Sequence, residues 1–135
     1  MTPKKLKTTA VNKSDYIIYL KKANDFYVIT KKASDLELWA AVGLNAVHCA
    51  ISCCDALLVF YLGIRSVSDN HMDVVDLLLR LPKKKAQDEV ATLKRILAKK
   101  NIIAYENREF RQQEALEILK LSDRFYVWVL SNLPR

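Results

Sequence analysis

Apolar residues recur three and four positions apart through most of the chain, which is the spacing of one face of an α-helix. The pattern predicts helices over about residues 14–32, 35–62, 71–81, 86–105 and 112–133. The chain has only 2 Gly and 3 Pro, so turns are scarce and long helices with short connections are favoured. We therefore expect an all-α fold: an antiparallel up-down helical bundle of four long helices plus one short helix.

The expected helix ends carry capping residues. Asn12 or Ser14 is suited to begin the first helix, and Ser34 or Asp35 the second. Gly63 follows the last apolar residue of the second helix, where a glycine commonly ends a helix. These signals divide the helical pattern into separate elements that can fold back on one another.

The domain organisation is simple. Residues 1–11 are expected to form a flexible basic lead, and residues 12–135 a single helical domain. Within that domain, Asp69 or Asn70 is expected to cap the short helix, and Pro82 to stop it.

The segment 35–62 is apolar on nearly every face, which predicts the central helix of the bundle. Asp55 lies in its middle, and a carboxylate there needs a hydrogen-bonded or charged partner. Arg65, Ser66 and His71 follow directly after the helix and are the nearest candidates. A buried acid facing such a corner either fixes the fold or forms a site.

The composition bears on membrane association, metal binding and the cellular compartment of the protein. The stretch Leu38–Cys54 is uncharged for 17 residues, at the lower limit for a membrane span, but it contains polar residues and the other helices are amphipathic. The 3 cysteines are all on this helix, too few and too local for a structural zinc site, and unpaired thiols suit a reducing cytosol. We expect a cytoplasmic protein with no membrane association, no metal and no other cofactor.

The net charge is +7 and is spread over several lysine clusters, including an expected exposed corner at Lys83–Lys85. Such a balance helps to bind an anionic partner such as RNA. A solvated lysine-rich surface explains the same composition.

Arg65 and His71 are the first candidates for chemistry. An arginine holds a phosphate through a charge-assisted fork, and a histidine can take or give a proton near neutral pH. Together they suit metal-independent RNA cleavage, with Asp55 orienting one of them or Lys100. The structural alternative is that His71 lies in the first turn of the short helix and only bonds Asp55 or a carbonyl.

A second polar group ends the fourth expected helix. Asn101 and Tyr105 are four positions apart and share a face, next to Lys100. These three side chains can hold a phosphate or a base. The structural alternative is that the Tyr105 hydroxyl ties the helix end to its neighbour. His48, on the central helix, is expected to be a satisfied core or interface histidine.

The chain resembles small HEPN-domain proteins (higher eukaryotes and prokaryotes nucleotide-binding domain) of bacteria and archaea. The resemblance covers roughly residues 14–133 and is carried by Ala46-Val47-His48, Ala50-Ile51, Cys54-Asp55-Ala56-Leu57, Gly63-x-Arg65-Ser66, His71, Lys100-Asn101-x-x-x-Tyr105-Glu106, Phe110, and the run with Ala115, Phe125 and Val129.

The resemblance implies a bundle that commonly dimerises, with its sites along the interface, and an association with RNA cleavage in toxin–antitoxin and defence systems. Many such domains work beside a small nucleotidyltransferase. The family signature is Arg, four to six residues, then His, near the last helices. At that place this chain has Lys100 and Tyr105, and a tyrosine with an ordinary pKa of ~10 is a poor substitute for histidine. Arg65 and His71 satisfy the spacing earlier in the chain.

Two functions are therefore weighed, beside a third reading in which the protein is a plain structural homodimer with a basic surface. The leading one is a HEPN-type helical module that binds RNA or nucleotide phosphate, with metal-independent ribonuclease activity as its enzymatic version. There His71 and Arg65 are catalytic, and Asp55, Ser66, Lys100, Asn101 and Tyr105 bind. The alternative is a non-catalytic dimeric subunit that pairs with a small nucleotidyltransferase. A homodimer is expected in both.

Overall fold

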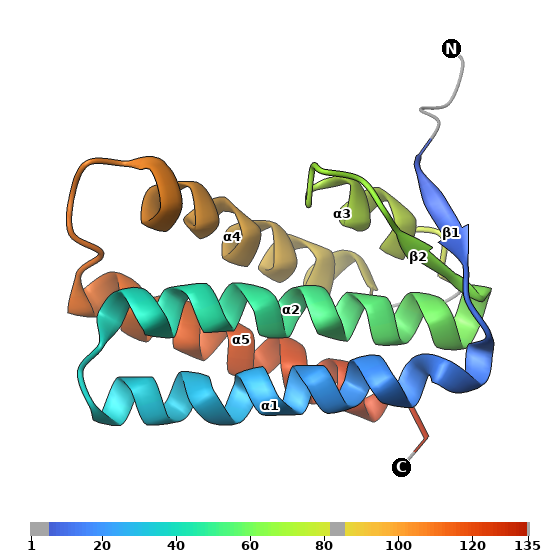
Figure 1. Cartoon of the computed structure of the whole chain (residues 1–135), viewed down its shortest axis with the longest axis horizontal. Helices are drawn as coiled ribbons and strands as arrows, with labels where there is room; N and C mark the ends of the chain where they lie inside the picture. The colour runs from blue at the N-terminus through green and yellow to red at the C-terminus, as the bar shows by residue number, and fades with distance from the viewer. Residues whose placement is uncertain (1–5, 82–85, 135) are drawn as a thin grey trace.

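The computed structural model describes residues 6–81 and 86–134, and the chain forms an antiparallel up-down helical bundle (Figure 1). The all-α prediction is confirmed. Consecutive long helices run in opposite directions, and a short helix lies beside the C-terminal half of the second one. The helices are α1 (Tyr16–Asp35), α2 (Trp39–Leu62), α3 (Asp73–Leu78), α4 (Ala86–Tyr105) and α5 (Gln112–Ser131).

Helix α2 is the centre of the bundle and packs against α1, α4 and α5 (Figure 1). It is long and apolar enough to cross a membrane by length and composition, but 78% of its most apolar stretch is buried by the rest of the protein. Close packing at its N-terminal half depends on Gly43, where a Cβ would lie 2.4 Å from Cδ1 of Ile103. This contact sets how closely the end of α4 approaches α2.

The first helix is longer than predicted, and the second starts later. Because α1 continues to Asp35 and α2 begins only at Trp39, the caps predicted at Ser34 or Asp35 are wrong. The corner is closed by backbone instead, since the N–H of Leu38 donates to the carbonyl of Ala33 over 2.9 Å.

The predicted end of the second helix at Gly63 is confirmed, whereas the predicted cap Asn12 acts on a turn before α1 and the residue flanking α1 is Asp15. Asn12 Oδ1 accepts the backbone N–H of Ser14 over 3.2 Å and so opens a single 3-10 turn, Lys13–Asp15, that leads into α1. Gly63 ends α2 with φ 64°, a left-handed conformation that glycine adopts without strain.

A small sheet lies beside the C-terminal end of α2, and no strand was predicted there. Strand β1 (Thr8–Ala10) pairs antiparallel with β2 (Ile64–Ser66), with Thr9 opposite Arg65. The pairing orders part of the expected lead, because the extended chain after Gly63 needs hydrogen-bond partners for its backbone. Helix α3 is also shorter than the predicted 71–81, and the expected corner at Lys83–Lys85 lies outside the described residues.

Candidate functional site

The buried carboxylate predicted on the central helix has its partner. Asp55 is only 4% exposed, and Nε of Arg65 donates to its Oδ2 over 3.3 Å. The reversal at Gly63 makes this contact possible, because it directs β2 back along the end of α2. The guanidinium also lies 5.2 Å from the ring centroid of Tyr19 on α1. The expected Asp55–Arg65 network is therefore present in the structure.

Asp55 sits in a weakly hydrated position, which changes its acidity. Burial raises the pKa of its carboxyl to about 6, although the positive charges of Arg65 and Lys22 act in the opposite direction. The pair is partly open to water, because 41% of the Arg65 side chain is exposed. Arg65 therefore keeps donor capacity for a ligand while Asp55 holds it in place.

The loop between β2 and α3 is shaped by its own small polar side chains. Ser66 Oγ accepts the N–H of Ser68 over 3.3 Å, and Ser68 Oγ in turn donates to Asp73 over 2.6 Å. Asn70 Oδ1 accepts the N–H of Met72 over 3.0 Å. These bonds fix the loop on either side of His71. Ser66 is thus placed beside Arg65, and it also has a structural role that the sequence did not indicate.

Two hollows meet at His71. The Arg65 hollow has a volume of about 230 Å³ and is lined by Ile51, Asp55, Arg65, Ser66, Val67, Ser68, His71 and Val74. The Lys100 hollow has a volume of about 160 Å³ and is lined by Asp69, Asn70, His71, Met72, Leu97, Lys100, Asn101 and Tyr105. All seven residues predicted for the site therefore line one of these hollows, and His71 lines both.

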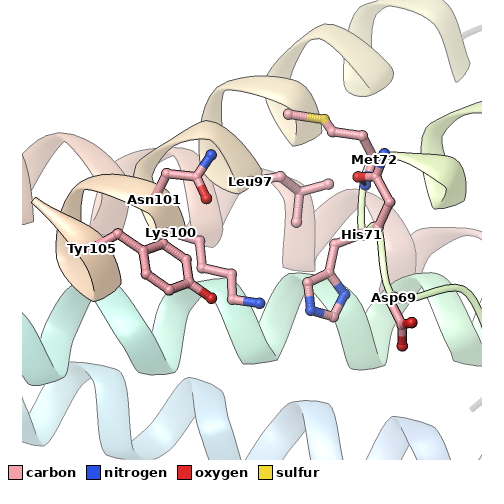
Figure 2. A pocket seen from close by; sticks show the side chains of 8 residues that line it. Asp69, His71, Met72, Leu97, Lys100, Asn101 and Tyr105 are labelled. Atoms are coloured by element: carbon pink, nitrogen blue, oxygen red, sulfur yellow. Dashed lines mark hydrogen bonds between the residues drawn. The ribbon is translucent and has the colours of Figure 1, made fainter.

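Figure 2 shows how the Lys100 hollow is arranged. The ammonium of Lys100 and the hydroxyl of Tyr105 both point toward α2, with the imidazole of His71 beside them. The carboxylate of Asp69 lies on the far side of His71 from Lys100. Tyr105 is 78% exposed, so its hydroxyl does not tie the helix end to a neighbour as the structural alternative supposed.

The surroundings of His71 favour the neutral form of its imidazole. Partial burial lowers the pKa of its imidazole, and the positive charge of Lys100 and the nearby His48 lower it further. A histidine that is neutral at pH 7 can accept a proton. Because His71 lines hollows that also contain Arg65 and Lys100, a proton acceptor stands between two groups suited to hold phosphate.

His48, which was expected to be a core or interface histidine, lines neither hollow. It is half-buried on α2, its ring stacks on Phe26 with centroids 5.3 Å apart, and burial followed by the charge of Lys100 lowers its pKa. His48, Ile51 and Asp55 are three and four positions apart and so share one face of α2.

Neither the protein-family models, nor the curated proteins, nor the solved structures gave a match to this chain. The structural description therefore rests on the chain's own geometry. Within residues 6–81 and 86–134, no group of three or more His, Cys, Asp or Glu side chains is placed to hold a metal ion. The candidate site consists of cationic and polar side chains around His71, with the carboxylates of Asp55 and Asp69 also in its lining.

Proposed function

We propose that this protein is a HEPN-type helical module that binds RNA or nucleotide phosphate at the two hollows around His71. The single observation that carries the proposal is that His71 lines both hollows, one holding Arg65 and the other Lys100. A guanidinium and an ammonium on either side of an imidazole suit the phosphate groups of a nucleic-acid strand. The net charge of +7 favours the approach of such a polyanion.

In the enzymatic version, the module is a metal-independent ribonuclease. His71 takes the proton of a ribose 2′-hydroxyl, and the 2′-oxygen attacks the adjacent phosphorus. The bond from phosphorus to the 5′-oxygen breaks, and that oxygen takes up a proton, leaving a 2′,3′-cyclic phosphate and a 5′-hydroxyl. Arg65 neutralises the charge that builds up on the phosphate oxygens, and Asp55 positions Arg65 through the 3.3 Å bond.

The remaining groups bind rather than react. Lys100 supplies a fixed positive charge, and Asn101 and Tyr105 supply hydrogen-bond donors at the outer edge of the Lys100 hollow. Ser66 adds a hydroxyl beside Arg65 in the other hollow. A cytoplasmic location, expected from the unpaired thiols, and a toxin–antitoxin or defence role, implied by the HEPN resemblance, form part of the proposal.

The test is cleavage of end-labelled single-stranded RNA by the purified protein in EDTA. We expect His71→Ala to abolish cleavage and Arg65→Ala to reduce it at least about tenfold. Tyr105→Phe should keep the reaction and weaken binding. Arg95→Ala is the matched control, because it removes one exposed positive charge. Arg95 pairs with Glu117, and neither residue lines the two hollows. Unchanged cleavage by His71→Ala would exclude the enzymatic version.

A second candidate is a non-catalytic dimeric subunit that pairs with a small nucleotidyltransferase. The observation favouring it is at the corner between α1 and α2, where Leu36 and Leu38 are 69% and 53% exposed. Exposed apolar side chains of this size are better accommodated against a protein surface than in water. Comparing the sedimentation of the double variant Leu36→Ser/Leu38→Ser with that of unmodified protein tests whether this corner is a dimer interface. Unmodified protein that binds RNA but does not cleave it would favour the non-catalytic subunit.

A further inference from the structure

Strand β1 has an open edge. Within the described residues the sheet consists of β1 and β2, with Thr9 opposite Arg65, and Figure 1 shows β1 on the outer side of β2, away from α3. All three residues of β1 are exposed. A strand at the edge of a sheet presents N–H and C=O groups that can pair with a further strand.

The bonding pattern of the sheet identifies the backbone groups that face outward. The N–H of Val67 donates to the carbonyl of Lys7 over 3.1 Å, so Lys7 directs its backbone groups toward the neighbouring chain. Because this direction alternates along an antiparallel strand, Thr9 also faces β2, whereas Thr8 and Ala10 face away from it. Outside the β1–β2 pairing, no described residue supplies a hydrogen bond to Thr8 or Ala10. Their N–H and C=O groups are therefore available to a ligand.

A hollow lies at the start of this edge. This outer hollow has a volume of about 630 Å³ and is lined by Leu6, Lys7, Thr8 and Val67. Val67 is 51% exposed and also lines the Arg65 hollow. A chain that pairs with β1 therefore has room for an apolar side chain beside Thr8, and it lies next to the candidate site.

The charge at this edge selects the kind of strand that can pair with it. Lys7 and Lys13 are exposed, and the side chain of Lys13 lies beside Gly63 at the other end of the sheet. Neither lysine forms an ion pair with another described residue. The sequence before β1 adds Lys4 and Lys5. A second copy of β1 would bring the same positive charges to this edge, whereas an acidic strand complements them.

We propose that the outer edge of β1 is the docking site for an extended, acidic segment of a partner protein, which adds a third strand to the sheet. Thr8 and Ala10 bind the backbone of this segment, and Lys7 and Lys13 pair with its carboxylates. The outer hollow takes one apolar side chain. Pairing of this kind favours a peptide over RNA, because a nucleic-acid strand does not present alternating donors and acceptors at strand spacing. The docking site does not depend on phosphate binding around His71.

The experiment measures backbone amide exchange by NMR in the full chain, with and without a defined peptide. The probe is the acetylated and amidated peptide Glu-Glu-Val-Thr-Val-Glu-Glu, and its control carries lysine in place of every glutamate. In the free protein the N–H groups of Thr8 and Ala10 should exchange quickly and that of Thr9 slowly. Saturating acidic peptide should slow exchange at Thr8 and Ala10 by at least about tenfold, and the lysine peptide should not.

The deciding variant is Ala10→Pro. It removes an N–H that faces away from β2, so the pairing of the two strands is kept, and the exchange rate at Thr9 verifies this. We expect it to bind the acidic peptide about three- to tenfold more weakly, the effect of one lost hydrogen bond. Ala10→Val keeps the N–H and should bind as unmodified protein does. Lys7→Gln with Lys13→Gln should also weaken binding, without touching the backbone.

Four results would overturn the inference. They are no protection of Thr8 and Ala10 by the acidic peptide, equal protection by the lysine peptide, equal protection by oligouridylate, and unchanged affinity in Ala10→Pro. Protection that is already present without peptide and rises with protein concentration would assign the edge to a second copy and so also overturn it. RNA cleavage by the same samples decides the proposed function separately.

Discussion

Nε of Arg65 donates to Oδ2 of Asp55 over 3.3 Å, and this bond connects β2 to the buried middle of α2. The folded protein raises the pKa of Asp55 from 3.8 to about 6, chiefly through burial. The folded state thus holds this proton more tightly than the unfolded chain does. The associated stability is fully present below pH 3.8 and is lost as pH rises through about 6.

Asp55→Asn should remove that pH dependence. Because the amide does not ionise, we expect the free energy of unfolding of the variant to increase relative to that of unmodified protein as pH rises from 4 to 7, by roughly 2 kcal/mol. Urea denaturation at four pH values across this range measures the difference. A difference that stays constant with pH would mean that the carboxyl of Asp55 is well solvated.

Lys100→Met should raise the pKa of both histidines. The charge of Lys100 lowers the pKa of His48 and of His71, so its removal brings each closer to the ordinary value of 6.5. Because the chain has 2 histidines, their imidazole resonances can be followed by NMR over a pH titration. Lys94→Met, an exposed position on the same helix, is the control and should change neither. Equal titration curves in both variants would place Lys100 away from the site.

The sequence predicted the helices well, because their signal is local. The apolar spacing and Gly63 specify α2 and its end, and the need of Asp55 for a partner led directly to Arg65. The sheet was missed because each strand has three residues and the pairing joins Thr9 to Arg65 across the length of two helices. Pairing of segments so distant in the chain leaves no periodic pattern in either one.

The candidate site was predictable as a set of residues but not as an arrangement. Arg65, His71 and Lys100 stood out by residue type, whereas their placement in two hollows joined at His71 depends on how α3 and α4 pack on α2. His48 is predicted to be a core or interface histidine because its neighbours in the chain are apolar. In the structure it stacks on Phe26 and lines neither hollow.

Gly43→Ala should destabilise the protein despite the better helix propensity of alanine. The new Cβ would lie 2.4 Å from Cδ1 of Ile103 and 2.7 Å from Cε2 of Phe110, so both side chains have to move. We expect the free energy of unfolding to fall by about 1–2 kcal/mol. Ile103→Val removes the nearer of these atoms, so the double variant should lose less than the sum of the two single losses. Strict additivity in urea denaturation would show that α4 does not approach α2 this closely.

The bond between Tyr27 on α1 and Asp123 on α5 should contribute measurably to stability. The Tyr27 hydroxyl donates to Asp123, and its ring stacks on Tyr126 with centroids 4.1 Å apart. Tyr27→Phe keeps the stacked rings and removes the hydroxyl, and we expect a loss of about 1 kcal/mol in thermal or urea unfolding. Tyr126→Phe is the comparison, since it removes a 3.0 Å bond to Asn24 from the same stack. Stability at or above that of unmodified protein in Tyr27→Phe would mean the bond is not formed in solution.

The three thiols of α2 should be unreactive while the bundle is folded. Cys49, Cys53 and Cys54 are each at most 1% exposed, and burial raises the pKa of Cys53 and Cys54 well above the usual value. Only the thiolate reacts with a disulfide reagent such as Ellman's reagent, so labelling at pH 8 requires α2 to become accessible. We expect negligible labelling in native buffer, labelling of all 3 cysteines in denaturant, and a rate between these limits that follows the unfolded fraction. Rapid labelling in native buffer would instead place α2 in exchange with an open state, which is incompatible with its central position in the bundle.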